Sequence, residues 1–412
     1  MDGGAVAKLD LRHLLAAAEA APPVDAIDVV GQELGRMVGA TRVGLLIANF
    51  SGDAVVRMSH VTVSDELRDG RNERTESIPL AGSVYEKVML SQELDVCPAG
   101  TAWDVLVPVT ERGDTIGMVE LTLSHHPEDS VVEFLESAAH ALAYVLIASR
   151  RHTDLFEWAQ RDIPFSLAAE IQRRLLPASY SVEAGAFTLA GWLEPASDVG
   201  GDTFDYSIGR EYLYASITDA MGHSTPAALL ATLTVGSFRN SRRTLASPSE
   251  QAALANAALL EGSRADQFVT GLLLRIRLAD GRLEIVNAGH PPPFRLRNGI
   301  GMLVDVDADP PLGITHAAYG THLVQLEPGD RLLFLTDGFL ERNAGAVDIQ
   351  KTLEVTAPRH PREIVRELAA NVLHATGGKL RDDATVLCLD WYGPQGRRHA
   401  TAGASRARAT DP

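Results

Sequence analysis

The stretch YLYASITDAMGHSTPAALLATLTVGSFRN, residues 212–240, places a strand directly before a helix. Its apolar strand pattern closes at Asp219, and Gly222 and Pro226 separate that aspartate from a long apolar helical pattern. A single aspartate at a strand end is more often a turn former than a metal ligand. The meaning of Asp219 therefore depends on whether similar carboxylates recur along the chain.

Three more aspartates stand at strand ends in short signatures. They are Asp202 in DVGGDTFDY (198–206), Asp337 in RLLFLTDGF (331–339) and Asp382 in LRDDATVLCL (380–389). Carboxylates that arrive from separate strands at one end of a sheet form an oxygen-rich site suited to hard divalent cations, and two such cations can activate water. Small neighbouring residues allow the backbone to approach an ion closely. The pattern predicts metal-dependent hydrolysis.

The surrounding sequence from residue 187 to residue 391 is dense in strands. Many antiparallel strands with helices gathered in a few blocks favour two stacked sheets with helices outside, an α+β four-layer α-β-β-α sandwich. The expected strands are 187–195, 203–209, 212–220, 268–279, 282–290, 293–299, 321–329, 330–338 and 384–391, and the expected helices are 225–240, 248–263 and 361–376.

Composition sets the broad class. A chain of 412 residues is too long for one ordinary core, and a net charge of −17 argues against binding to nucleic acid or to an anionic membrane. Cys97 and Cys388 stand far apart, which indicates neither a disulfide framework nor a zinc site. The sequence contains no apolar run long enough to suggest a membrane span. We expect a cytoplasmic protein.

The pattern divides the chain into five parts. We expect an N-terminal helix or tail (1–24, with a helix over 9–20), an α+β domain (25–148), a helical linker (149–180), the sandwich domain (181–393) and a disordered basic tail (394–412). In the α+β domain, residues 103–124 read as a hairpin that turns at 112–114, and the charged stretch 64–77 reads as a solvated loop.

The closing hairpin, with its V-P-V, a short polar turn and I-G-M-V-E-L, resembles that of GAF domains, the sensor modules of bacterial signalling. Residues 131–163 then contain neither glycine nor proline and repeat apolar residues at heptad spacing, with a break in that spacing at Ser149 and His152. This predicts a helix about 50 Å long. Either the helix joins the domains and pairs two chains, or its first half packs back on the GAF-like domain.

The C-terminal motifs resemble the SpoIIE/RsbU-type bacterial branch of the PPM metal-dependent protein phosphatases. The helix E-I-Q-R-R-L-L-P (170–177) is similar to the segment that precedes the catalytic domain in that branch. Six further motifs follow in the family's order: VGGD (199–202), DAMGH (219–223), NAGHPP (287–292), PLGI (311–314), TDG (336–338) and DDAT (382–385).

This resemblance implies two manganese or magnesium ions as cofactors. Asp219 would bridge them, and the backbone carbonyl of Ala220 would also bind. Asp337 and Asp382 would complete the first ion, while Asp202 would serve the second, either directly or through water. Asp219 and Asp337 are thus the predicted catalytic residues, in a direct attack on phosphoserine by hydroxide held between the ions.

Other polar residues near these motifs receive smaller roles. Asp205 and Asp383 stand out of phase with their neighbours, so we interpret both as supporting, and Asp383 should face away from Asp382. His223 could contact phosphate or protonate the leaving oxygen, or it could be a loop residue; His290 reads as structural.

The C-terminal motifs depart from the family pattern at one position and leave one expected role unassigned. Ser224 stands where the family commonly has glycine. No arginine can be assigned to the phosphate, and Arg173, Arg174 and Arg210 are the candidates.

The hypothesis is a sensor-regulated serine/threonine phosphatase. By resemblance, its substrate would be a phosphorylated STAS-type anti-anti-sigma factor, its GAF-like domain would take a small-molecule or protein ligand, and its linker would form a homodimer. One alternative is a catalytically weak phosphatase-fold scaffold that responds to a partner. Another, hydrolysis of a small phosphoester, has no glycine-rich phosphate loop to support it.

Overall fold

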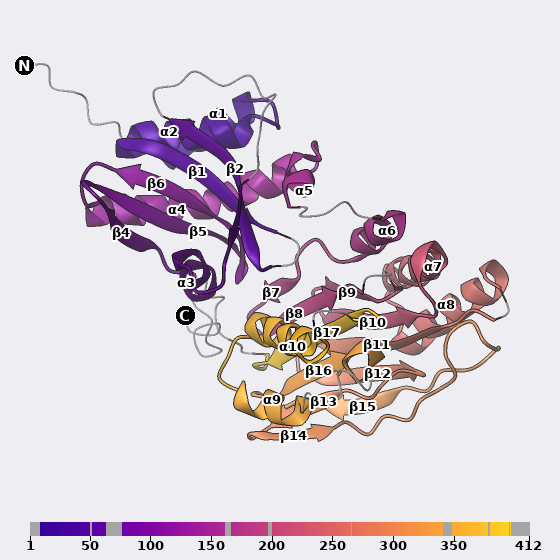
Figure 1. The fold of residues 1–412 in the computed structure, drawn as a ribbon. Helices are drawn as coiled ribbons and strands as arrows, with labels where there is room; N and C mark the ends of the chain where they lie inside the picture. Colours follow the sequence, from indigo (N-terminus) through magenta and orange to yellow (C-terminus); the bar gives the residue numbers. More distant parts are fainter. Residues whose placement is uncertain are drawn as a thin grey trace, which may run out of the picture. The chain divides into compact units, whose positions relative to one another are not determined.

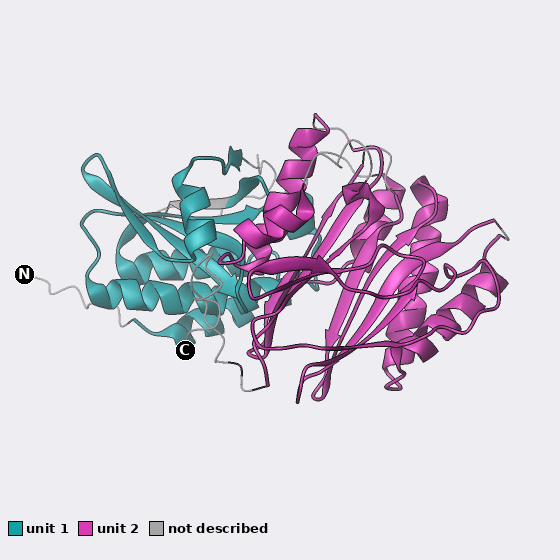
Figure 2. Ribbon diagram, turned by 90° about the horizontal axis from the view of Figure 1, so that it is seen from below, with its two compact units in different colours: residues 1–164, 401–403 teal, residues 165–400, 404–412 magenta. Residues whose placement is uncertain are grey.

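The computed structural model describes residues 9–49, 52–62, 76–160, 166–196, 200–264, 266–340, 348–377, 380–394 and 396 (Figure 1). The chain forms two compact units, chiefly Met1–Pro164 and Phe165–Ala400, coloured separately in Figure 2. Each unit has its own sheets and its own apolar cores. We describe each unit by itself.

Unit 1 contains one antiparallel sheet in the order β3-β2-β1-β6-β5-β4. The predicted hairpin is confirmed: β5 and β6 pair and turn at Arg112 and Gly113, both with positive φ. Such a two-residue turn matches the twist of its strands. The strands are β1 (Ala40–Ala48), β2 (Ala54–Thr62), β3 (Glu76–Pro79), β4 (Asp95–Ala99), β5 (Ala102–Glu111) and β6 (Asp114–Leu123).

Helices cover both faces of this sheet. On one face, α1, α2, α4 and α5 bury apolar side chains against β1, β5 and β6, and on the other α3 packs Val88 and Met89 on Leu46 and Met118. The α+β class is thus confirmed for unit 1, and its GAF-like identity stays a prediction. The helices are α1 (Leu11–Ala20), α2 (Ala26–Val38), α3 (Val84–Ser91), α4 (Asp129–Ser149) and α5 (Leu155–Ala159).

The predicted single helix over 131–163 is wrong. α4 ends at Ser149, and α5 begins only at Leu155. The His152 amide donates to the Ser149 carbonyl (3.0 Å) in a turn, and the Thr153 hydroxyl accepts from the Leu155 amide (3.1 Å). Hydroxyl side chains favour a new helix start because they satisfy a free backbone amide. The break in heptad spacing at Ser149 and His152 coincides with this turn, but the lack of glycine and proline favoured a continuous helix.

Among the described residues, α4 alone is long and apolar enough to cross a membrane by length and composition. Its Leu135, Leu142 and Leu146 are buried in the core of unit 1. A buried apolar stripe is what a core helix presents to its own sheet. Packing within unit 1 therefore accounts for the apolar side chains on one side of α4, whereas Tyr144 and Ile147 are exposed.

Unit 2 contains two antiparallel sheets, in the orders β15-β12-β11-β10-β9 and β14-β13-β16-β17-β8-β7. Each strand expected in residues 187–391 is present, and the short strands β7 and β14 are additional. The five-stranded sheet holds β9 (Thr203–Ile208), β10 (Tyr212–Ala220), β11 (Val269–Arg277), β12 (Arg282–Ala288) and β15 (His322–Gln325). The six-stranded sheet holds β7 (Ser181–Glu183), β8 (Phe187–Glu194), β13 (Phe294–Arg297), β14 (Ile300–Leu303), β16 (Arg331–Leu335) and β17 (Ala384–Trp391).

The two sheets of unit 2 share one apolar core, to which Phe204 and Leu272 come from one sheet and Phe334 and Leu387 from the other. Helices α7 and α8 pack on the outer face of the five-stranded sheet, and α9 and α10 on that of the six-stranded sheet. The predicted four-layer α-β-β-α sandwich is confirmed. The helices are α6 (Leu167–Leu175), α7 (Ser224–Arg242), α8 (Pro248–Gly262), α9 (Ile349–Val355) and α10 (Pro361–Ala375).

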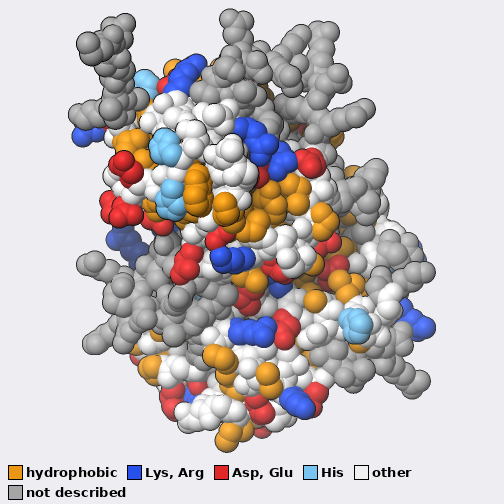
Figure 3. All heavy atoms as spheres, turned by 60° about the vertical axis from the view of Figure 1, so that its left-hand side comes forward, with side chains coloured by type: hydrophobic (Ala, Val, Ile, Leu, Met, Phe, Trp, Pro, Cys, Tyr) orange, Lys and Arg blue, Asp and Glu red, His pale blue; other side chains and the backbone are white. Residues whose placement is uncertain are grey.

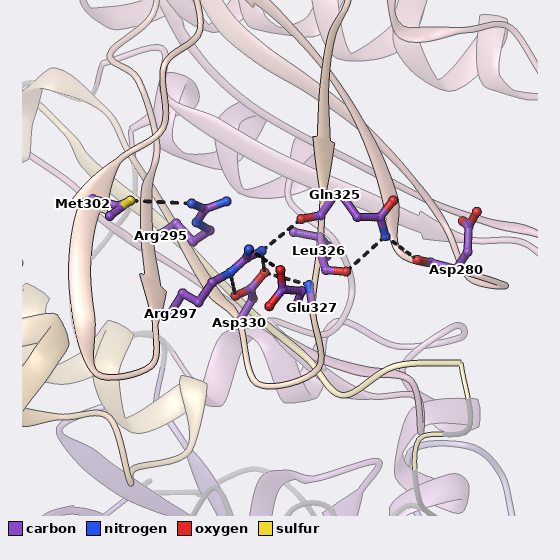
Figure 4. A network of polar contacts seen from close by, with 8 residues as sticks. All are labelled: Asp280, Arg295, Arg297, Met302, Gln325, Leu326, Glu327 and Asp330. Atoms are coloured by element: carbon purple, nitrogen blue, oxygen red, sulfur yellow. Dashed lines mark hydrogen bonds and ion pairs between the residues drawn. The ribbon is translucent and has the colours of Figure 1, made fainter.

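A polar cluster joins the two sheets of unit 2 at the start of β16 (Figure 4). Arg297 of β13 donates twice to the Asp330 carboxylate (2.7 and 2.6 Å) and once to the Gln325 carbonyl of β15 (3.0 Å). The bidentate pairing fixes the guanidinium in one orientation. Because Asp337 follows the other end of β16, this cluster holds the sandwich together at the end remote from the signature aspartates.

Some predicted features fall outside the described residues. These are residues 64–75 of the charged loop, Val199 of the first motif, and the tail 394–412 except positions 394 and 396. The last two residues of the charged stretch, Glu76 and Ser77, belong to β3. The loop prediction is therefore wrong for those two, which belong to an edge strand, although both are exposed as a solvated stretch would be.

Candidate metal centre

Two of the signature aspartates meet at one end of the five-stranded sheet. Asp202 directly precedes β9, and Asp219 is the last residue but one of β10. The two strands run antiparallel with Thr203 opposite Thr218, and the hydroxyl oxygens of these threonines lie 2.6 Å apart. The pairing register therefore brings Asp202 and Asp219 to the same edge.

The six-stranded sheet brings the other two aspartates to this edge. Asp337 opens the 3-10 turn η1 (Asp337–Phe339) after β16, and Asp382 stands shortly before β17, the antiparallel partner of β16. A hydrogen bond then connects the two sheets, because Thr336 Oγ1 donates to Asp202 Oδ2 at 2.7 Å. The four predicted carboxylates thus share one edge of the sandwich.

Two glycines let the backbone pass close to these carboxylates. A Cβ at Gly200 would lie 2.9 Å from both Asp382 Oδ1 and Asp383 Oδ2. A Cβ at Gly201 would lie 2.7 Å from the carbonyl oxygen of Ala220, the predicted backbone ligand. Both distances are below van der Waals contact, so neither position admits a side chain without movement. The glycines are required here by close approach.

Asp383 does not face away from Asp382 as predicted, since both carboxylates approach Gly200. Strand alternation does not apply, because β17 begins only after these residues. The buried Asp383 carboxylate accepts from the amides of Ala196 (2.8 Å) and Gly200 (3.0 Å) and from the side chain of Gln172. It anchors the chain that leads into β9, which is a supporting role.

Sequence reasoning missed Gln172. This residue lies on α6 and is buried, and its Nε2 donates to the Asp202 carbonyl (3.0 Å) as well as to Asp383. The helical pattern of 170–177 identifies an apolar face but does not distinguish a glutamine that is buried among carboxylates from one in solvent. Through Gln172, α6 contacts the backbone and side chains of the aspartate edge.

Crowding of the carboxylates shifts their pKa values. Burial, followed by the charges of Asp219 and Asp383, raises the pKa of Asp202 well above its usual range. Burial, followed by the charges of Asp337, Asp382 and Asp383, raises the pKa of Asp219 to about 7. Concentrated negative charge of this kind favours cation binding and is typical of functional sites.

The donor set fits hard divalent cations. The predicted ligands are carboxylates and one backbone carbonyl, and all-oxygen sites suit magnesium and manganese. Within the described ranges, no three acidic, histidine or cysteine side chains already stand in the arrangement of a finished metal site. Binding would therefore require the carboxylates to turn toward common points. The ligand assignments of Asp202, Asp219, Ala220, Asp337 and Asp382 stay predictions.

Asp205 serves a different purpose from Asp202. Its buried carboxylate accepts twice from Arg239 (3.0 Å each) and once from Arg242 (2.8 Å). Arg239 also donates to the Leu175 carbonyl at the end of α6. These bonds connect β9, α6 and α7, in agreement with the supporting role inferred for Asp205.

The two candidate histidines differ in exposure. His223 is exposed at the N-cap of α7, beside Ser224, whose φ of 64° is unusual for a residue other than glycine. His290 is buried, its Nδ1 lies 3.0 Å from Thr270 Oγ1, and burial lowers its pKa to about 3. A histidine with so low a pKa is neutral at physiological pH and cannot supply a proton as imidazolium.

The candidate phosphate arginines lie on two different segments. Arg210 precedes β10, on the order of 25 Å from its other end at 3.3 Å per residue. Arg173 and Arg174 lie on α6, where Arg174 pairs with Glu170 (3.2 Å). The exposed Arg381, which adjoins Asp382, was missed because its motif was read only for carboxylates.

The sequence around this site is similar to that of a known protein family. Residues 209–392 match the model of the stage II sporulation protein E (SpoIIE) family. These residues are thus similar to the SpoIIE family over less than half of the chain. The SpoIIE match contains Asp219, Asp337 and Asp382 but begins after Asp202. Asp202 is therefore grouped with the other three aspartates by its position at the same edge of the sandwich, and not by the family match.

Solved structures similar to the chain include further phosphatase domains. One contains the RsbU and RsbW domains of Rv1364c from Mycobacterium tuberculosis (21% identity, TM-score 0.48, 56% of this chain and 65% of that chain, under two thirds of its length). A second is the PP2C domain with a regulatory fragment of SpoIIE from Bacillus subtilis, with 15% identity and a TM-score of 0.43 over 74% of this chain and 86% of that chain. A third is the SiaA-PP2C domain of Pseudomonas aeruginosa, with 22% identity and a TM-score of 0.45 over 54% of this chain and 93% of that chain.

Proposed function

We propose that this chain is a divalent-metal-dependent protein serine/threonine phosphatase. The observation that carries the proposal is the convergence of four carboxylates from two sheets on one edge of a SpoIIE-family domain, where burial, followed by the charges of Asp337, Asp382 and Asp383, raises the pKa of Asp219 to about 7. Such a cluster is costly unless cations offset its charge.

Each residue of the edge has a defined task in this proposal. Asp202, Asp219, Asp337, Asp382 and the Ala220 carbonyl would hold two manganese or magnesium ions. When bound, such ions activate water and offset charge on a phosphoryl group.

The surrounding residues maintain this geometry. Gly200 and Gly201 keep the backbone close to the carboxylates, and Asp383 fixes the chain before β9 through the Ala196 and Gly200 amides. No side-chain nucleophile is needed, and buried Cys388 lies within β17.

The substrate we propose is the phosphoserine form of a STAS-type anti-anti-sigma factor. The support is the resemblance of the C-terminal motifs to the SpoIIE/RsbU-type branch and the match to the SpoIIE family. On the face shown in Figure 3, acidic, basic and hydrophobic side chains are interspersed. Partner choice there would depend on local contacts more than on the overall charge of −17.

We further propose that unit 1 is a GAF-like sensor that regulates this activity. The support is the order along the chain, with unit 1, then α6, then the SpoIIE-family domain, together with the contacts of Gln172 on α6. A shift of α6 would move the Asp202 carbonyl, and a shift of α7 would move Asp219.

Two further features of the proposal, the homodimer and the regulation by unit 1, have direct tests. The chain would form a homodimer through the linker region and would act in the cytoplasm. Light scattering of the full chain at several concentrations tests the dimer. For regulation, equal activity of the full chain and of residues 165–393, with every ligand tried, would count against a sensor.

The decisive assay is manganese-dependent release of phosphate from a phosphorylated STAS-type protein. We expect turnover by the wild type, loss of turnover on chelation, and little turnover by Asp219→Ala or Asp337→Ala. Glu261→Gln, exposed on α8 and outside the predicted ligand set, is a control for carboxylate loss. If the wild type binds the phosphoprotein without turnover, the chain is the scaffold instead.

A further inference from the structure

Thr336 links the two sheets of unit 2 at the metal centre through the hydrogen bonds of its backbone and side chain. It directly follows β16 and directly precedes Asp337, and its side chain is fully buried. Its amide donates to the Thr385 carbonyl at 3.0 Å, and its Oγ1 accepts from the Thr385 amide at 2.9 Å. Two bonds to one residue of β17 therefore fix both the backbone and the hydroxyl oxygen of Thr336.

These bonds determine where the Thr336 hydroxyl proton points. A hydroxyl carries one proton and two acceptor sites, and the Thr385 amide takes one acceptor site. In the bond of 2.7 Å to Asp202 Oδ2 the Thr336 hydroxyl is the donor, as it must be when Asp202 holds a metal ion, because a ligating carboxylate is ionised and its oxygens only accept. The β-branched side chain of threonine also restricts χ1, so this direction is held firmly.

The consequence concerns the orientation of Asp202. One of its two carboxylate oxygens is held by a group of the opposite sheet, while the Asp219 carboxylate is a close neighbour on its own sheet. A carboxylate held at one oxygen presents the other in a defined direction. A hydrogen-bonded partner of this kind orients a metal ligand in the way that outer residues do in known metal sites.

We propose that Thr336 is a positioning residue of the metal centre, whose hydroxyl holds Asp202 Oδ2 so that the other oxygen of this carboxylate faces the ion shared with Asp219. This inference rests on the proposed two-metal function. It assigns the threonine of the TDG motif a task distinct from that of Asp337, and it explains how a residue of one sheet sets a ligand of the other.

The test measures manganese binding by isothermal titration calorimetry on the full chain. Thr336→Val keeps the shape and removes the hydroxyl, and Thr336→Ser restores the hydroxyl. Thr188→Val is the matched control, because Thr188 is equally buried in β8 and its hydroxyl makes no hydrogen bond within the described structure. We expect Thr336→Val to lower the affinity for one of the two manganese ions by about 10- to 100-fold. Thr336→Ser and Thr188→Val should bind manganese with near wild-type affinity.

A double-mutant cycle with Asp202→Asn separates positioning from general damage, since Thr336→Val should then cause little additional loss of affinity. Circular dichroism and urea unfolding establish that each variant folds, and Thr336→Ala replaces the valine variant if that one does not. Two ions bound by Thr336→Val with wild-type affinity would overturn the inference and leave the proposed function intact. A wild type that binds no manganese would overturn both.

Discussion

Replacing Gly201 by alanine tests the requirement for close approach at the metal centre. The new Cβ would lie 2.6 Å from the Ala220 Cβ and 2.7 Å from the Ala220 carbonyl oxygen. Carbon atoms normally approach to about 3.5–4.0 Å, so the two segments must separate by about 1 Å. Overpacking of this size costs about 1–3 kcal/mol, which corresponds to roughly a 5- to 150-fold loss in manganese affinity if the strain falls on the bound state.

The assay is calorimetric titration of manganese together with urea unfolding of the metal-free chain. Gly236→Ala is the matched control, because its Cβ would meet no heavy atom within 4 Å on α7, and alanine in a helix interior is more stable than glycine by about 1 kcal/mol. We expect the control to bind normally. If Gly201→Ala binds manganese and unfolds like the wild type, then contact between this loop and the end of β10 is not needed.

Three further predictions concern the network around the site. Asp390→Ala should lower the free energy of unfolding in urea by about 3–5 kcal/mol, because it leaves the fully buried Arg331 guanidinium unpaired. Metal-free protein should lose stability as pH rises from about 4 to about 7: with its pKa raised to about 7, folded Asp219 holds a proton that the unfolded chain has released. A thermal melt series should show this slope, and Asp219→Asn should flatten it. Gln172→Ala should weaken manganese binding in calorimetry by about 10-fold or more, because Asp383 and the Asp202 carbonyl lose a donor; unchanged binding would argue against a link from α6.

Strand periodicity predicted the sandwich well because each apolar run in unit 2 ends at an unambiguous turn or aspartate. The shared position of the four aspartates could also be expected, since each stands at a strand boundary. Their mutual contacts could not, because they depend on the register between two separate sheets. The bond from Thr336 to Asp202 joins residues 134 positions apart.

The errors have local physical causes. The helix over 131–163 was predicted from apolar spacing, while the turn at His152 and the hydrogen bond from the Leu155 amide to the Thr153 hydroxyl stabilise a break between α4 and α5. Asp383 was assigned by strand alternation to the wrong side, because alternation fails before the first residue of β17. Nothing in the sequence indicated that Gln172 is buried, because the burial of a polar side chain depends on the elements that pack over it.

Anomalous diffraction from a crystal grown with manganese tests the central claim most directly. The account predicts two manganese peaks at the aspartate edge of unit 2, with Asp219 between them, Asp337 and Asp382 on one ion, and Asp202 on the side of the other. No manganese peak at this edge under conditions that support phosphate release, or peaks that contact none of these carboxylates, would contradict it.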